Sequence, residues 1–158
     1  MGIRGVVADG WGYENYHWEA FGSKFDPEGS MYVALGLSMS YHSRAVFRGW
    51  GFKITPEGKS IPIVSGMRSP GGIGFNKEGA LFYIESQGPW NSSCSLKFVQ
   101  EGVFMGHPAS YNWYQFVPGM EAPVEPKSGS SILAEMERIP ELVPYAVIFP
   151  YIRMGRSL

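Results

Sequence analysis

Three short repeats constrain the fold of this chain more than any other feature of its sequence. They are FDPEGSMYVAL at residues 25–35, KITPEGKSIPIV at 53–64 and GFNKEGALFYI at 74–84. Each has an apolar lead-in, a Glu-Gly pair and then an apolar or alternating run. Glycine supplies the positive φ that tight hairpins need, and the flanking Val, Ile, Phe and Tyr favour strands. The repeats therefore predict successive antiparallel hairpins.

The spacing of the Glu-Gly pairs indicates how these hairpins are assembled. Gly58 follows Gly29 by 29 residues, and Gly79 follows Gly58 by 21 residues. Four-stranded meanders that repeat every ~40–50 residues are typical of β-propeller blades. We predict an all-β fold, a partial β-propeller of about two and a half to three blades made of antiparallel four-stranded meanders. A single β-sandwich of the same size is the alternative on pattern alone.

The expected domain is one incomplete propeller that occupies residues 1–158. Its approximate blade units are residues 16–64, 65–110 and 130–158, and a long loop rich in Pro, Gly and aromatic residues occupies 107–130. A loop of that length usually has a functional role.

The residues after this loop have a less regular pattern. SILAEMERIPEL, residues 131–142, predicts a strand that leads into a short helix. Pro144 and Pro150 would confine the last β segment to a sheet edge or an inner wall, because proline cannot donate to a ladder.

Composition favours an ordered domain and argues against several function classes. Hydrophobic residues make up 44% and charged residues 17%, which argues against disorder. A net charge of −1 without a basic run argues against a nucleic-acid partner. The single cysteine, Cys94, excludes an intrachain disulfide. The chain has no signal peptide by pattern and no stretch long enough to cross a bilayer.

The strand predicted near residue 84 ends at an unusual break, Gln-Gly-Pro-Trp. Gly88 lets the backbone approach a ligand closely, and Pro89 fixes the turn. Their carbonyls could then face a hard cation, which takes oxygen ligands at about 2.3–2.6 Å. The alternative is a tight inter-strand turn with Trp90 packed beneath it.

The combination SGMRSPGGIGFNKEGALFYIESQGPWN and, further on, FVQEGVFMGHP resembles the glucose/sorbosone dehydrogenase family. The likeness extends over about residues 16–158 and is closest to the propeller domains of membrane-bound dehydrogenases in that superfamily, which are large exported bacterial proteins. The resemblance implies a six-bladed β-propeller that oxidises sugars with calcium and pyrroloquinoline quinone (PQQ). It also implies a periplasmic or extracellular location.

The same resemblance implies a set of site residues. The carbonyls of Gly88 and Pro89 would hold the calcium. Arg68 would contact the cofactor, and Ser69 and Gly71 occupy the positions where quinone-binding relatives have asparagine and glutamine. His17, ahead of the first hairpin, would be the catalytic general base.

Further polar residues near these positions have two interpretations each. Glu85 and Gln87 could add oxygen ligands near the calcium, or they could cap the end of the strand. His107 matches a turn of the family and is interpreted as a turn-packing residue. Ser93, Cys94 and Ser95 lie where relatives have acids for a second, structural calcium, so we expect that site to be absent.

These observations lead to three hypotheses. The first is part of a sugar or alcohol dehydrogenase-like propeller, calcium-dependent and quinone-dependent, with little activity as an isolated chain. The second is a non-catalytic binding or scaffold module of a larger exported protein, which the residues at 69 and 71 favour. The third is a lactonase-like calcium propeller. About three blades cannot close a six-bladed ring, so the expected partners are the remaining blades or a second copy, besides the small-molecule substrate.

Overall fold

The structure is a computed structural model that describes residues 5–6, 8–12, 20–37, 45–91 and 93–149. His17, the expected general base, lies outside the described residues.

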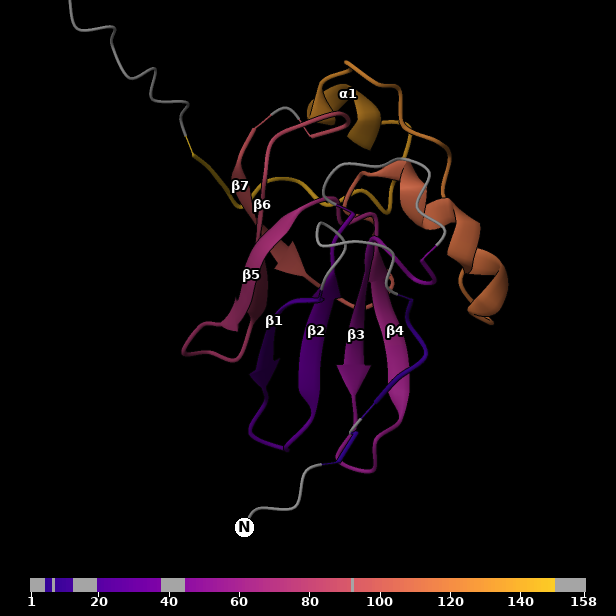
Figure 1. The fold of residues 1–158 in the computed structure, drawn as a ribbon. Helices are drawn as coiled ribbons and strands as arrows, with labels where there is room; N and C mark the ends of the chain where they lie inside the picture. The colour runs from indigo at the N-terminus through magenta and orange to yellow at the C-terminus, as the bar shows by residue number, and fades with distance from the viewer. Residues whose placement is uncertain (1–4, 7, 13–19, 38–44, 92, 150–158) are drawn as a thin grey trace, which may run out of the picture.

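The described chain forms two antiparallel four-stranded sheets, named here sheet A and sheet B (Figure 1). Sheet A comprises β1 (Ala20–Phe25), β2 (Met31–Leu35), β3 (Trp50–Ile54) and β4 (Ser60–Ser65), in that spatial order. Sheet B comprises β5 (Pro70–Phe75), β6 (Leu81–Glu85), β7 (Ser95–Val99) and β8 (Val147–Ile148), again in chain order.

The three predicted Glu-Gly hairpins are confirmed, and their turns share one construction. Each turn ends on a glycine in the left-handed region; these are Gly29, Gly58 and Gly79, with φ of 88°, 85° and 83°. Each turn also begins with a side chain that accepts the backbone N–H four residues on; the pairs are Asp26 with Ser30, Thr55 with Lys59 and Asn76 with Ala80. A side-chain acceptor followed by glycine closes the turn from both ends.

The first hairpins of the two sheets repeat each other in register as well as in turn type. In both sheets the first pair of strands has an irregularity near its start, between Phe21 and Ser23 in β1 and between Pro70 and Gly72 in β5. Strand β1 of sheet A contacts strand β5 of sheet B. At Gly22 a Cβ atom would be 3.3 Å from the backbone nitrogen of Ile73. The first strands of the two sheets therefore approach each other closely.

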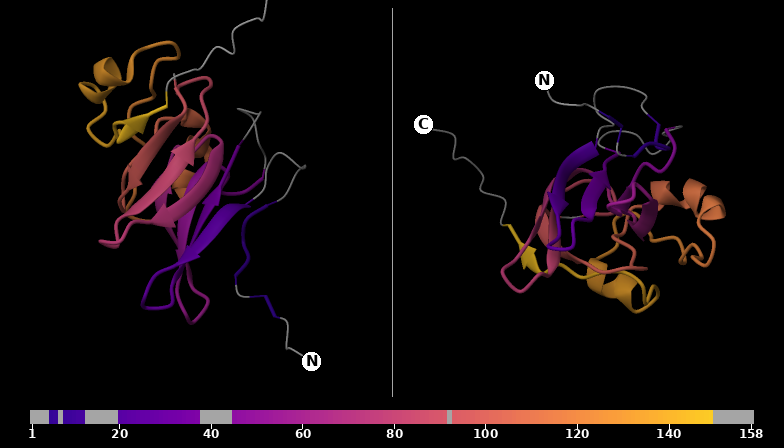
Figure 2. Two further views of the ribbon diagram at one scale, coloured as in Figure 1. Left: turned by 90° about the vertical axis from the view of Figure 1, so that its left-hand side faces the viewer. Right: turned by 90° about the horizontal axis from the view of Figure 1, so that it is seen from below.

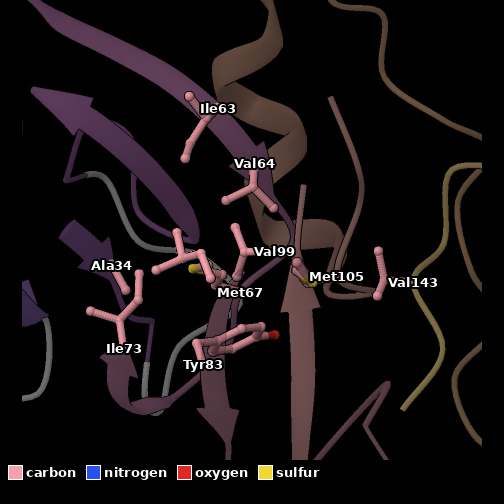
Figure 3. Packing of buried hydrophobic residues seen from close by; sticks show 10 residues of the cluster. Ala34, Ile63, Val64, Met67, Ile73, Tyr83, Val99, Met105 and Val143 are labelled. Carbon is pink, nitrogen blue, oxygen red and sulfur yellow. The ribbon is translucent and has the colours of Figure 1, made fainter. Parts of the chain in front are cut away.

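The main hydrophobic core lies between the two sheets (Figure 3). Ala34 and Val64 of sheet A are fully buried there, and Tyr83 of sheet B is 1% exposed. Met67, on the connection between the sheets, is also fully buried in this cluster. After β7 the chain returns to sheet A, where Phe104 forms a parallel bridge with Ser65. The sheets are thus joined by shared side chains and by backbone pairing.

The predicted long loop at 107–130 contains a helix that the sequence pattern does not predict. A 3-10 helix, η1 (Pro108–Phe116), begins at the N-cap His107 and packs on the face of sheet A that is turned away from sheet B. Its Tyr114 lies 4.8 Å from Trp50, measured between ring centroids. Tyr114 is buried in this contact, and Tyr111 and Trp113 pack against it partly buried.

The C-terminal part of the described chain completes sheet B. Strand β8 pairs antiparallel with β7, so the described part of unit 130–158 adds an edge strand to the second sheet instead of forming a sheet of its own. The edge position agrees with the prolines of this segment. The strand predicted within 131–142 is not present; α1 (Ile132–Met136) forms there, capped by Ser131.

The described part of the chain is therefore all-β in character, with two short helices. None of its helices has the length and apolar character needed to span a membrane.

Candidate functional site

The Gly-Pro break forms a closed four-residue turn directly after β6. The backbone N–H of Gly88 donates to the Asn91 carbonyl at 2.7 Å, and the Asn91 N–H donates back to the Gly88 carbonyl at 3.0 Å. Trp90 has a φ of 61°, a conformation that costs a non-glycine residue about 1–2 kcal/mol. Surrounding contacts must hold this turn in place.

Trp90 is anchored by two such contacts. Its indole N–H donates to the Pro126 carbonyl at 3.0 Å. Its ring lies edge-on to the His107 imidazole, with 5.1 Å between ring centroids and an interplanar angle of 76°. Trp90 therefore packs within the turn, as the alternative interpretation of this segment expects. Pro89 beside it is exposed.

Arg68 lies against the same turn. Its Nη1 donates to the Gln87 carbonyl at 2.9 Å. A Cβ atom added to Gly88 would be 2.2 Å from Cζ of the Arg68 guanidinium. A side chain at position 88 would therefore force the guanidinium or the turn to move, and the structure brings together two residues that the sequence places 20 positions apart.

Glu85 is buried at the end of β6 and caps three backbone groups. Its Oε1 accepts from the backbone N–H of Ser69 at 2.7 Å and of Ser86 at 3.1 Å. Its Oε2 accepts from the Arg68 backbone N–H at 3.0 Å and from the Tyr83 hydroxyl at 2.9 Å. With 1% exposure and both oxygens engaged, Glu85 acts as a cap of the strand end rather than as an outward oxygen ligand.

A buried lysine lies near this carboxylate. Lys97 sits opposite Tyr83 across β6 and β7, and its Nζ donates to the Met105 carbonyl at 2.6 Å. Burial lowers the pKa of Lys97 to about 8, against the opposing effect of the Glu85 charge. Burial, with the Glu85 carboxylate next in importance, raises the pKa of Tyr83 well above its usual value. Tyr83 and Lys97 are buried in the protein interior, so they support the end of β6 and are not exposed to a ligand.

His107 joins the turn to η1, as the interpretation of it as a turn residue expects. It is 6% exposed, and its Nδ1 accepts the backbone N–H of Ala109 at 3.3 Å. Burial, and then the charges of Arg68 and Lys97, lower its pKa to about 3. The imidazole is therefore neutral at physiological pH and serves as an acceptor.

The expected cofactor residues are near one another but differ in what they present. Arg68 and Ser69 are half-buried, and Gly71 is exposed. The backbone N–H of Ser69 is already used by Glu85. The guanidinium of Arg68 is thus the charged donor that this group offers.

The turn offers oxygen atoms, which are the ligands that hard cations such as calcium bind. Calcium takes about six to eight oxygen ligands, and the turn offers the carbonyls of Gly88 and Pro89. The side-chain oxygen of Asn91 is buried and has no hydrogen-bond partner, and no sequence pattern indicated this acceptor. Among the described residues no group of three or more His, Cys, Asp or Glu side chains could hold a metal. A cation at this turn would therefore take its other ligands from elsewhere.

An anionic cofactor suits the guanidinium as well. Arginine offers five N–H groups in a planar fork that matches carboxylates, and the contact to Gln87 uses one of them.

No family model matches this chain, and no curated protein is similar enough to it to indicate a family.

Proposed function

We propose that this chain is part of a sugar or alcohol dehydrogenase-like propeller and supplies one wall of a site that uses calcium and PQQ. Gly88 and Pro89 would hold the calcium through their carbonyls, and Arg68, with Ser69 and Gly71 beside it, would bind the quinone. His17 would act as the base. The observation that supports the proposal is the contact of the Arg68 guanidinium with the Gly88 turn.

In this arrangement the residues at the turn bind and orient, and His17 would take the proton of the substrate. The quinone, when bound, would accept the hydride of the substrate. Arg68 would hold an anionic group beside the turn, and this anion would offset the repulsion between the guanidinium and a bound cation. Calcium and quinone should therefore bind more tightly together than separately.

Calcium binding tests the metal part of the proposal. Isothermal titration of the chain with calcium should give a Kd on the order of 10⁻⁴–10⁻³ M, the range of weak extracellular sites. Gly88→Ala should weaken binding at least about tenfold, because its Cβ, 2.2 Å from Cζ of Arg68, would push the turn and its two carbonyls out of position. Gly74→Ala is the matched control, since its Cβ meets nothing within 4 Å. Absence of binding at millimolar calcium would contradict the proposal.

Quinone binding tests the cofactor part. Arg68→Met should abolish the effect of PQQ on calcium affinity while leaving calcium binding itself in place. Dye reduction with a panel of aldoses and alcohols should require both ligands and further propeller sheets. If PQQ has no effect on calcium affinity in the unsubstituted chain, the dehydrogenase reading fails.

A non-catalytic binding or scaffold module is the second candidate. The observation in its favour is that Arg68 already clamps the Gln87 carbonyl and that Glu85 caps three backbone N–H groups. Both residues therefore have structural roles that need no cofactor. Calcium binding that is lost in Gly88→Ala but is indifferent to PQQ would favour this candidate or a lactonase-like propeller.

A further inference from the structure

The first hairpin turns of the two sheets line one hollow of about 660 Å³, named here the hairpin hollow. These are the turn between β1 and β2 in sheet A and the turn between β5 and β6 in sheet B, and Lys53 of β3 also lines the hollow. In the left view of Figure 2 both turns lie at the lower end of the sheets, away from the segment that follows β6. The hollow is therefore separate from the Gly88 turn, which lies beyond the other end of β6.

Aromatic side chains form the apolar part of the hairpin hollow. Phe25, at the end of β1, lines it and is 65% exposed. Tyr32 and Phe75 line it as well and pack edge-on across the two sheets, with 5.2 Å between ring centroids. An aromatic side chain offers a large, rigid contact area at a small cost in conformational entropy. The hollow thus presents ring surface to a ligand from both sheets.

Two corresponding residues of the turns, Asp26 and Asn76, supply polar groups to the hollow. Oδ1 of Asp26 accepts the backbone N–H of Ser30 at 2.8 Å. Oδ1 of Asn76 accepts the backbone N–H groups of Glu78 at 3.1 Å and Ala80 at 2.8 Å. Each side chain is held by its own turn and keeps one further arm, the acceptor Oδ2 of Asp26 and the donor Nδ2 of Asn76. In the described part of the chain, no protein group accepts from this Nδ2.

The charges around the hollow offset one another. Two carboxylates line it, those of Asp26 and Glu28, and so do two ammonium groups, those of Lys53 and Lys77. Nζ of Lys53 lies 3.8 Å from Oδ2 of Asp26 and 5.5 Å from the centroid of the Tyr32 ring. Equal numbers of opposite charges give no net attraction for an anion or a cation. The lining therefore favours a neutral ligand that has both an apolar face and polar groups.

We propose that the hairpin hollow binds a neutral pyranose ring, free or as one unit of a glycan chain. The C–H groups on one face of a pyranose leave water when they stack on an aromatic ring such as Phe25. Its hydroxyl groups both donate and accept hydrogen bonds, which suits the acceptor of Asp26 and the donor of Asn76. This inference does not rest on calcium or quinone, because none of the residues assigned to bind them lines the hollow.

Titration of the full chain with D-glucose and with maltotriose, followed by NMR of the backbone amides, tests the site. The Kd for glucose should be on the order of 1 mM, as expected for a ligand as small as one sugar ring. Amide shifts should be confined to residues 25–32, 53 and 75–79, which surround the hollow. Binding of either sugar supports the proposal, and tighter binding of maltotriose identifies a glycan chain as the source of the ring.

The variants Asn76→Asp and Asp26→Asn test the polar arms. Both keep the side-chain oxygen that closes the turn, and both exchange donor and acceptor on the remaining arm. Each should weaken glucose binding about tenfold through the lost hydrogen bond. Phe25→Leu should also weaken binding and keep the fold, because this side chain is mostly exposed. Glu57→Gln is the control, since it lies in the turn between β3 and β4 outside the hollow, and it should leave the Kd unchanged.

Absence of amide shifts at ~100 mM of either sugar, well above the expected Kd, would overturn the proposal. The proposal also fails if glucose affinity is unchanged in both Asn76→Asp and Asp26→Asn while circular dichroism and unfolding midpoint match the unsubstituted chain. Shifts at residues 86–91 alone would place the sugar at the opposite end of β6, which would contradict this site and leave the dehydrogenase proposal standing. Sugar binding at the hollow without calcium binding would have the reverse meaning.

Discussion

At the scale of single residues, the turn after β6 depends on groups that satisfy one another. Glu85 accepts from the backbone of residues 68, 69 and 86, and Arg68 supports the carbonyl of Gln87. The sequence indicated both Arg68 and the Gly-Pro turn, and it offered strand capping as one role for Glu85. It could not indicate which backbone groups the carboxylate caps, because two of them belong to another segment of the chain.

The neutral imidazole of His107 should make stability depend on pH. Its pKa is lowered to about 3 in the folded chain, against about 6.5 when unfolded. The unfolded state therefore binds more protons between pH 3 and 6.5, and the free energy of unfolding should fall with acidification by up to ~1.4 kcal/mol per pH unit from this group. Urea denaturation across this range measures the slope.

The variant His107→Asn isolates that contribution. Asparagine keeps a side-chain acceptor at the N-cap but does not titrate. The difference in unfolding free energy between the two chains should change across pH 3–6.5 and be constant above it. A pH-independent difference would mean that His107 titrates normally in the folded chain.

At the scale of elements, the hairpin turns are the most locally determined parts of the chain. Each needs a glycine in the left-handed region and an acceptor at its start, and both are close in sequence. Local rules failed for η1, and they predicted β8 as an edge segment without indicating the strand it pairs with, because both form against distant residues. The aromatic residues of η1 become apolar contacts only where the outer face of sheet A is available to cover.

The substitution Gly79→Ala tests whether the third hairpin turn depends on a glycine in the left-handed region. The φ of 83° at Gly79 is strained for alanine, although its Cβ would meet nothing within 4 Å. The free energy of unfolding should fall by about 1–2 kcal/mol, and Gly79→Asn should cost less because asparagine tolerates this conformation. Chemical denaturation of both variants measures the order. Glu78→Ala, in the same turn, should change stability by less than about 0.5 kcal/mol. Equal costs for alanine and asparagine would contradict this account.

At the scale of the whole molecule, the two sheets share one core and should unfold together. Met67 connects them and is fully buried among residues of both sheets. Its position between sheets follows from the packing of β2, β4, β6 and β7, not from any local pattern.

Met67→Ala tests this coupling. Removing the side chain should cost about 2–5 kcal/mol and should lower the hydrogen-exchange protection of β2 and β6 amides by the same factor, because both depend on the shared core. Leu133→Ala, at an exposed position, is the control and should leave the protection of both strands unchanged. Loss of protection in one sheet alone would show that the sheets are independent units.

The sequence by itself determined the turns, the alternation of buried and exposed residues along the strands and hence the all-β class, because these properties depend on neighbouring residues. Tertiary structure decided how the sheets pair, that Arg68 lies beneath Gly88, and that residues 147–148 complete sheet B. Those outcomes depend on contacts between distant segments, whose free energies appear only when the sheets pack together.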